Sequence, residues 1–373
     1  MDDLFRKAAY FAIKRKFLRV SVIDLDAMRE IAEALYVPHV HRHFGASGVD
    51  ALRRLVSSVR RIYRDVDPSL LDGDLMVIAR PTGASVVTSL GAVAHSVAAG
   101  QFIQHQIAGD TLVEVLSADR LEIRPGTVDP ASLSSEAIVY LYRDRSEQIF
   151  ISGETFTIRN PSPAAMVSIF ARPTFSSLDA ALTRYATEVV NKTVCFILGH
   201  EVDGIWADDN RLFLRSKPEE VMRRSLHQYL RDAFPDAEVR PEQIVDESHP
   251  VDIKVTWADT THRAIIEIKW IGDSIDGEGR ITTPYRDARA RKGAQQLSEY
   301  LDGDAETAAR LRTRGYLVVI DARRRGLVEG QVTISVTDGL HYRDREIVYD
   351  PDYHALRQDF APPVRMFAEP RTL

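Results

Sequence analysis

The stretch RAIIEIKW, residues 263–270, places two opposite charges inside a run of isoleucines. Side chains alternate between the two faces of an extended strand, so Glu267 and Lys269 project to the same side. The flanking isoleucines and the tryptophan project to the other side. This pattern predicts a strand with one apolar face and one face that carries an anion beside a cation. The charged face either meets water or lines a site that needs charge.

A second acid lies on a neighbouring predicted strand. Asp252 stands 15 residues before Glu267, and the turn sequence ADTTH at 258–262 lies between the two segments. An antiparallel hairpin can bring Asp252 beside Glu267. Two carboxylates next to a lysine predict a site for Mg²⁺ or Mn²⁺, because hard divalent cations prefer carboxylate oxygens. The lysine can orient an attacking water or stabilise charge on a phosphate.

Asp252 followed by Glu267-Ile268-Lys269 resembles the core of the PD-(D/E)xK nuclease superfamily, which has a restriction-endonuclease-like fold. Members include many restriction and repair endonucleases. The resemblance covers residues 216–322, about a third of the chain. It implies a mixed sheet flanked by helices and a metal-dependent phosphodiesterase.

Two flanking segments extend the resemblance. The family places a metal-binding glutamate on the helix before the core sheet, and PEEVMRRSLHQYL offers Glu219 or Glu220. Glu219 borders the apolar stripe of that helix whereas Glu220 points outward, so Glu219 is the expected ligand. After the lysine strand, Gln296 and Tyr300 match the Q-x-x-x-Y element of RecB-like members.

The resemblance implies a role for each of these residues. Asp252, Glu267 and the carbonyl of Ile268 would hold one metal ion, and Glu219 would hold or position a second. Lys269 would orient the attacking water. Gln296 would brace the lysine and the metal shell, and Tyr300 would pack near or touch the substrate.

The segment RITTPYRDARARK, residues 280–292, leads from the lysine strand to the helix of Gln296 and is strongly basic. Cationic side chains at the entrance of a metal site attract nucleic-acid phosphates. The expected phosphate contacts are Arg286, Arg289, Arg291 and Lys292.

A competing triplet, Asp252-Ile253-Lys254, also fits the acid-x-lysine pattern. In that alternative, Glu242 or Asp246 would supply the earlier acid. The later triplet is preferred because its strand is more apolar and because the Gln/Tyr helix follows it at a suitable distance.

Composition limits the class of protein. The chain has 373 residues, a formal net charge of -6 and one cysteine, Cys195. Any nucleic-acid binding must therefore come from local basic patches, and an intramolecular disulfide framework is excluded. No apolar run approaches the length that spans a bilayer, and charges interrupt the N-terminal segment where a signal peptide would be apolar. We expect a cytoplasmic protein without a membrane partner.

The pattern of elements predicts an α/β protein, α+β overall, with three domains. Residues 1–110 look mainly helical, residues 111–205 look mixed, and residues 206–373 read as helix, three strands, helix and strand. Two further strands are expected at 331–336 and 345–349. In the first two domains, helices are expected at 24–36, ended by Pro38, and at 83–103, a loop at 39–44 and a strand at 193–198.

Taken together, these features predict a Mg²⁺-dependent DNA endonuclease that its N-terminal region directs or regulates, with a role in defence against foreign DNA by family analogy. Two alternatives remain open. One is an RNA nuclease or a RecB-like repair exonuclease, and the other is a non-catalytic nucleic-acid-binding or scaffold protein. Assembly of the chain into a homo-oligomer is compatible with either.

Overall fold

The computed structural model describes residues 25–82, 90–98, 109–158, 167–244, 250–282, 284–307 and 311–372. Its helices and strands form a mixed α/β protein, as the sequence predicts. The chain divides into two compact units. The first consists of residues 1–177 and 259–262, and the second of residues 178–258 and 263–373.

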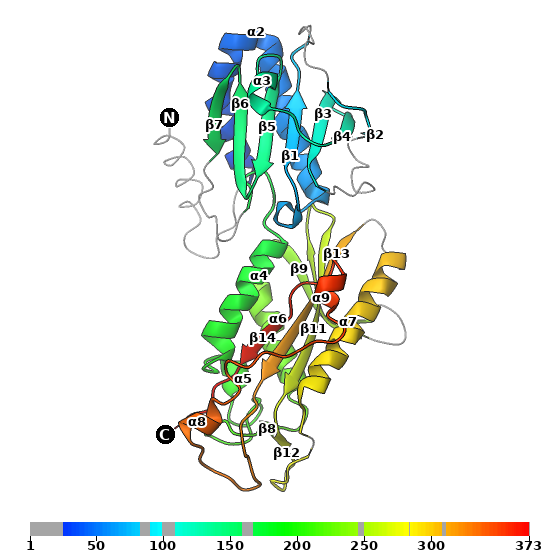
Figure 1. The fold of residues 1–373 in the computed structure, drawn as a ribbon. Helices are drawn as coiled ribbons and strands as arrows, with labels where there is room; N and C mark the ends of the chain where they lie inside the picture. Colours follow the sequence, from blue (N-terminus) through cyan, green and yellow to red (C-terminus); the bar gives the residue numbers. More distant parts are fainter. Residues whose placement is uncertain are drawn as a thin grey trace. The chain divides into compact units, whose positions relative to one another are not determined.

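The first unit is built on one seven-stranded sheet with the strand order β2-β4-β3-β1-β5-β6-β7. The long helix α2 (Leu25–Asp65) lies against one face of this sheet (Figure 1). Two short helical turns, η1 (Pro68–Leu70) and α3 (Pro130–Leu133), accompany it. The strands are β1 (Leu75–Ala79), β2 (His95–Ala98), β3 (Thr111–Ser117), β4 (Arg120–Pro125), β5 (Ile138–Arg143), β6 (Ser146–Ile151) and β7 (Glu154–Ile158).

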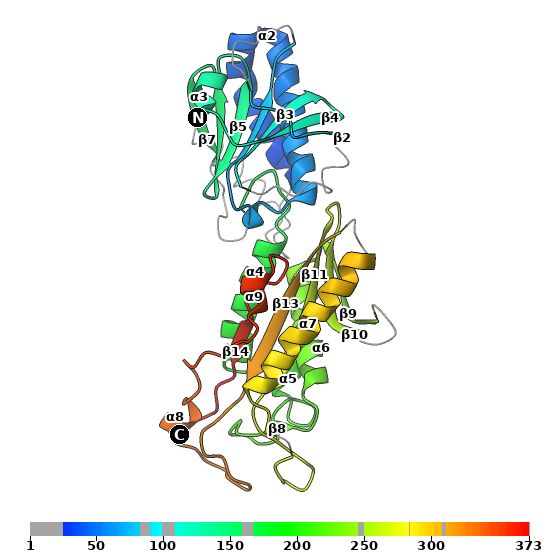
Figure 2. The same cartoon turned by 45° about the vertical axis from the view of Figure 1, so that its right-hand side comes forward.

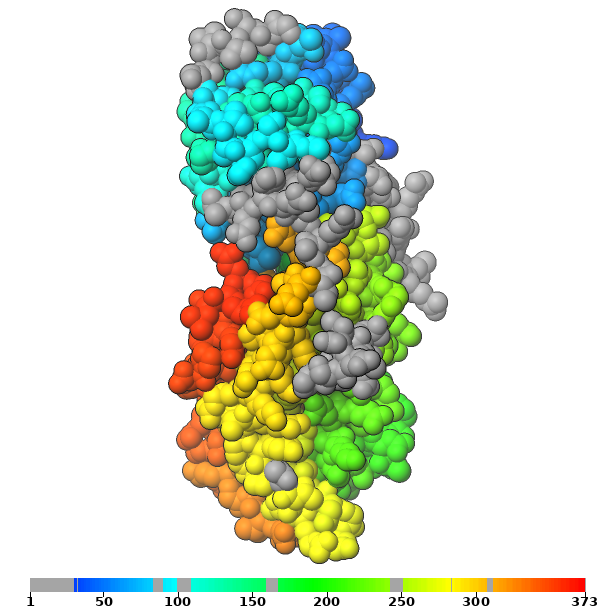
Figure 3. Space-filling view, turned by 90° about the vertical axis from the view of Figure 1, so that its right-hand side faces the viewer, coloured from blue at the N-terminus to red at the C-terminus, as the bar shows by residue number. Residues whose placement is uncertain are grey.

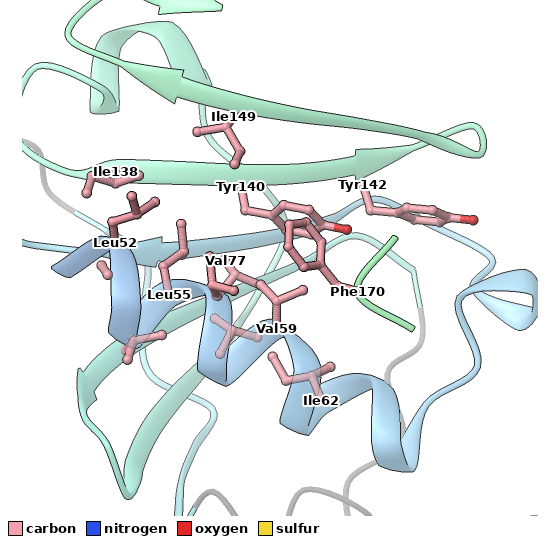
Figure 4. Close-up of a cluster of buried hydrophobic side chains, with 14 of the residues drawn as sticks. Leu52, Leu55, Val59, Ile62, Val77, Ile138, Tyr140, Tyr142, Ile149 and Phe170 are labelled. Carbon is pink, nitrogen blue, oxygen red and sulfur yellow. The ribbon is translucent and has the colours of Figure 1, made fainter. Parts of the chain in front are cut away.

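Helix α2 packs its apolar stripe onto the sheet. Leu52, Leu55 and Val59 point toward Val77 of β1 and Tyr140 of β5 in the core of the first unit (Figure 4). The spacing of these helix residues, i, i+3 and i+7, is that of an amphipathic helix. The hydrophobic pattern of the sequence therefore defines the packing face of α2.

The expected domain boundaries at 110 and 205 are wrong. Strand β1 precedes residue 110, but both of its neighbours in the sheet, β3 and β5, follow it. A sheet whose central strand comes early in the chain cannot be divided there, because its hydrogen bonds join the two segments. Residues 178–205 belong to the second unit. Pairing between distant strands, which composition does not reveal, decides these limits.

The expected end of the first helix at Pro38 is also wrong. Helix α2 continues through Pro38, and the residues expected as a loop at 39–44 are helical. Tyr36 and Val40 are buried in the core on either side of the proline. Packing therefore overrides the preference of proline for a helix end.

The backbone of α2 leaves helical geometry at Gly45, where φ is 61° and ψ is -154°. Almost only glycine adopts this conformation, so Gly45→Ala is expected to destabilise the protein by about 1–3 kcal/mol. Steric overlap would not contribute, since a Cβ at this position meets no atom within 4 Å. Urea unfolding of the full-length protein measures the change. An unchanged midpoint would show that the kink tolerates an L side chain.

Several smaller expectations also fail. The region expected as a helix at 83–103 contains strand β2, which pairs with β4. The expected strand at 193–198 overlaps the short helix α5 (Phe196–Gly199). No strand forms at 331–336 or 345–349, and the short helix α8 (Val336–Gly339) begins at the end of the first segment. The β-branched residues of the segments 331–336 and 345–349 have a high strand propensity. Propensity alone does not form a strand, because a strand also needs a neighbouring strand with which to pair.

The second unit contains a five-stranded sheet with the strand order β14-β13-β11-β10-β9. Helix α7 covers one face, and α6 and α4 lie on the other (Figures 1 and 2). The order helix, three strands, helix, strand that the sequence predicts is confirmed for α6 to β13. The sheet and its helices are α4 (Phe175–Arg184), α6 (Glu219–Ala233), β9 (Ala237–Ile244), β10 (Pro250–Trp257), β11 (His262–Ile271), α7 (Asp287–Thr307), β13 (Arg312–Asp321) and β14 (Val364–Phe367).

Smaller elements complete the second unit. The π-helical segment η3 (Tyr185–Val190) continues α4, the short strands β8 (Leu214–Arg215) and β12 (Ser274–Ile275) pair with each other, and α9 (Tyr353–Leu356) contacts α7. Among the residues that the structure describes, none of the helices has the length and hydropathy that crossing a bilayer requires.

Candidate active site

The charged face of β11 is buried. All ten residues of this strand are buried, and Glu267 and Lys269 are only 3% and 7% exposed. By strand alternation they share a face with Ile265 and Ile271, which pack against Ala294 and other residues of α7. The two charges therefore lie under a helix, and the interpretation as a solvated strand face is excluded.

Helix α7 passes close to Lys269 because it carries a glycine at the crossing point. A Cβ on Gly293 would lie 2.5 Å from Cγ of Lys269 and 3.1 Å from Cδ1 of Leu317. The Lys269 ammonium donates to Glu267 in a short ion pair, and its Nζ lies 3.4 Å from Oε1 of Glu219. The side chain is thus fixed between two carboxylates.

Asp252 lies beside Glu267, as the hairpin spacing predicts. The antiparallel register pairs Ile253 with Ile266, so the next step along the two strands sets Asp252 opposite Glu267. Oδ2 of Asp252 accepts a hydrogen bond from the backbone N–H of Ile268 at 2.8 Å, and its Oδ1 lies 3.3 Å from Nη1 of Arg223. Sequence reasoning did not identify Arg223, although it stands four residues after Glu219 on α6 and so shares its helix edge.

Glu219 reaches the same cluster from the first residue of α6. Its side chain is 27% exposed; besides the contact with Lys269, its Oε2 accepts a hydrogen bond from Nη2 of Arg289 at 2.7 Å. Glu220 is exposed. The structure therefore brings Glu219, and not Glu220, to Asp252, Glu267 and Lys269.

Burial and mutual repulsion shift the ionisation of the two strand acids. Burial, followed by the charge of Asp252, raises the pKa of Glu267 to about 7. Burial also raises the pKa of Asp252, although the N–H of Ile268 and the charge of Lys269 oppose the shift. Burial by itself lowers the pKa of Lys269, but Glu267 and Glu219 outweigh it, so this pKa lies above its usual value. The lysine stays charged while the acids resist ionisation.

The raised pKa of Glu267 predicts a pH dependence of stability in the metal-free protein. Between pH 4.5 and about 7 the folded state keeps a proton that the unfolded state releases. The stabilisation from this group is complete below pH 4.5 and is lost as the pH rises through 7. We expect a loss of roughly 3 kcal/mol across this window, measured by urea unfolding. Glu267→Gln should remove most of this slope; an unchanged slope would contradict the prediction.

Gln296 and Tyr300 lie on α7 beside this cluster, and both are half-buried. Gln296 makes no side-chain hydrogen bond with any residue that the structure describes, so the expected brace to Lys269 is not formed here. Tyr300 packs at the border of the apolar core under α7. Burial, and then the charges of Glu267 and Asp252, raise the pKa of Tyr300. The phenol therefore interacts electrostatically with both strand acids.

The basic residues expected to contact phosphate separate into two groups. Arg289 points to Glu219 and belongs to the cluster. Arg286, Arg291 and Lys292 are exposed. Arg286 donates to Asp273 at 2.7 Å, and Nη1 of Arg291 lies 3.3 Å from the carbonyl oxygen of Val348.

The lysine of the competing triplet, Lys254, does not join the cluster. Burial, and then the charge of Arg263, lower the pKa of Lys254, and its other charged neighbours are Asp304, Arg240 and Glu238. None of these is a member of the cluster around Lys269. The earlier acid of this alternative would be Glu242 or Asp246. The side chain of Glu242 and the whole of Asp246 lie outside the described residues.

The carboxylates of Asp252 and Glu267 have the chemistry to hold a divalent cation that water and a substrate phosphate also coordinate. Among the described residues, no group of three or more His, Cys, Asp and Glu side chains is arranged to hold a metal ion. Asp252 and Glu267 nevertheless form a buried carboxylate pair whose repulsion a divalent cation would relieve. Mg²⁺ is commonly held by one or two carboxylates together with water and substrate phosphate, and not by an all-protein cage. The pair suits that mode.

No family model, curated protein or solved structure matches this chain. The resemblance to the PD-(D/E)xK superfamily therefore stays a prediction from the sequence.

Proposed function

We propose that the second unit hydrolyses phosphodiester bonds in nucleic acid, with DNA as the substrate and Mg²⁺ or Mn²⁺ as the cofactor. One observation carries the proposal. Four charged residues from three separate elements, Glu219 of α6, Asp252 of β10, and Glu267 and Lys269 of β11, converge in one buried cluster. Buried charges are costly to maintain, and such clusters mark functional sites.

Each residue of the cluster has a chemical role in this proposal. Asp252, Glu267 and the carbonyl of Ile268 would hold a divalent cation, which would supply charge stabilisation to the phosphate. Lys269 stays charged between its two carboxylates, so it can orient a water or stabilise negative charge on the reacting phosphate. Glu219 holds the lysine from the other side and can position a second cation.

The surface beside the cluster favours a polyanion. Figure 3 shows α7, in yellow, on the surface of the second unit. The exposed Arg286, Arg291 and Lys292 lie on or next to its first turns, and cations in such a position attract phosphates. Since the whole chain carries a net charge of -6, this local patch and not the overall charge would attract the substrate.

Cleavage assays with the purified full-length chain test the proposal. Supercoiled plasmid, linear duplex DNA and RNA are incubated with Mg²⁺, with Mn²⁺ or with EDTA. We expect nicking or linearisation of the plasmid only with the metal. Cleavage restricted to linear DNA would indicate an exonuclease, and cleavage restricted to RNA a ribonuclease. No cleavage, together with no calorimetric binding of Mn²⁺, would favour a scaffold protein and overturn the proposal.

The first unit, in this proposal, directs or restrains the nuclease in the cytoplasm, and the protein acts in defence against foreign DNA. The separation of the chain into two compact units supports such a division of work. Phage and plasmid restriction by cells that express the wild type and the Glu267→Gln variant tests the role. Equal restriction by both would contradict it.

A further inference from the structure

We propose that Arg289 couples the binding of the divalent cation to the binding of nucleic acid. In the free protein it neutralises Glu219, and with a cation on the carboxylates it turns to a substrate phosphate. This inference rests on the proposed function and names a positioning residue for the same site. The contacts of Arg289, an unused donor and the balance of charge carry it.

The side chain of Arg289 has two contacts that keep it beside the cluster. Besides its hydrogen bond to Glu219, its guanidinium lies over the ring of Tyr285, with Cζ 4.3 Å from the ring centroid. Tyr285 exchanges two backbone hydrogen bonds of 2.9 Å with Gly272. Its ring packs edge-on against Trp270, with the two ring centroids 4.6 Å apart. The aromatic support holds the guanidinium beside the cluster whether or not Glu219 remains its partner.

The Nε donor of Arg289 makes no hydrogen bond with the described residues. This nitrogen is buried, although the side chain as a whole is 26% exposed. A buried donor without an acceptor is unfavourable, so a rotation of the side chain that brings Nε to a phosphate oxygen would satisfy this donor. The planar fork of a guanidinium matches the two free oxygens of a phosphodiester.

The formal charges of the cluster balance when its three acids are ionised, which is the state in which they would hold a cation. Three carboxylates, on Glu219, Asp252 and Glu267, face three cations, on Arg223, Lys269 and Arg289. A divalent cation added to this buried group leaves an excess of positive charge, and a phosphate anion restores the balance. The binding of the cation and of the nucleic acid should therefore be mutually favourable, with equal effect in both directions.

Calorimetric titration of the full-length protein with Mn²⁺, alone and with a phosphorothioate DNA duplex that resists cleavage, tests the coupling. Arg289→Gln is expected to bind Mn²⁺ alone about tenfold more tightly than the wild type, because one nearby positive charge is removed. The duplex should raise the Mn²⁺ affinity of the wild type but change that of the variant little.

Arg286→Gln is the matched control, since it removes the same charge three residues earlier from an arginine that pairs with Asp273. It should bind Mn²⁺ alone as the wild type does. Arg289→Lys keeps the charge but not the fork, so it should bind Mn²⁺ alone as the wild type does and respond less to the duplex. Equal Mn²⁺ affinities for Arg289→Gln and Arg286→Gln would overturn the coupling.

The failure of the proposed function gives a different result. In that case the wild type and all variants, Glu267→Gln included, would show the same Mn²⁺ titration, because no cation would bind through the strand carboxylates. That outcome would overturn both proposals. Mn²⁺ binding that Glu267→Gln abolishes and Arg289→Gln leaves unchanged would overturn the coupling alone.

Discussion

Lys269→Ala is expected to lower metal-dependent cleavage by at least about a hundredfold, and up to about a thousandfold, while the protein stays folded. The ammonium contacts both Glu267 and Glu219, and the proposed chemistry needs a cation where negative charge develops on the phosphate. Removal of the lysine leaves the carboxylates in place, so the variant should still bind Mn²⁺.

The sequence offers a matched control for this variant. Lys254 is the lysine of the competing triplet and lies among different charged neighbours. Lys254→Ala should retain cleavage within about threefold of the wild type, because surface and half-buried charges away from the site contribute little. The measurement is the rate of plasmid nicking under saturating Mg²⁺. If Lys254→Ala lost activity and Lys269→Ala kept it, the site would lie at the other triplet.

Asp321→Ala is expected to lower the free energy of unfolding by about 3–5 kcal/mol. Asp321 is fully buried at the end of β13. It accepts hydrogen bonds from Arg323 at 2.8–3.0 Å and from Nε of Arg365 at 2.7 Å, and its Oδ2 lies 2.6 Å from Nη2 of Arg365 in an ion pair. Its removal would take the buried carboxylate from two arginines, and Arg323 would keep only its ion pair with the partly exposed Asp287. Breaking a buried ion pair by removing one partner costs more than the pair itself contributes.

This network also bears on the candidate site. Arg323 pairs with Asp287, the first residue of α7, at 2.5 Å, so the network joins β13 to the helix turn that carries Arg289. We therefore expect the surviving folded fraction of Asp321→Ala to cleave more slowly. Asp302→Ala is the control, since Asp302 forms an exposed ion pair with Arg357 that should contribute less than about 1 kcal/mol. Equal urea midpoints for the two variants would contradict the prediction.

The sequence by itself determined the order of the elements from α6 to β13 and the identity of the charged residues that they carry. Alternation in RAIIEIKW predicted which side chains of β11 share a face, and the spacing of Asp252 from Glu267 predicted their meeting across a hairpin. Helical periodicity also selected Glu219 over Glu220. These properties depend on residues close together in the chain, where geometry follows a fixed repeat.

Only the tertiary structure decided where those charges lie and what balances them. The burial of Lys269 depends on a helix that can approach because residue 293 is glycine, and the pairing of Arg289 with Glu219 joins residues 70 positions apart. The division into two units follows from β1 pairing with β3 and β5, and α2 continues through Pro38 because its neighbours are buried. Each of these outcomes depends on contacts between distant segments, for which local periodicity and propensity contain no information.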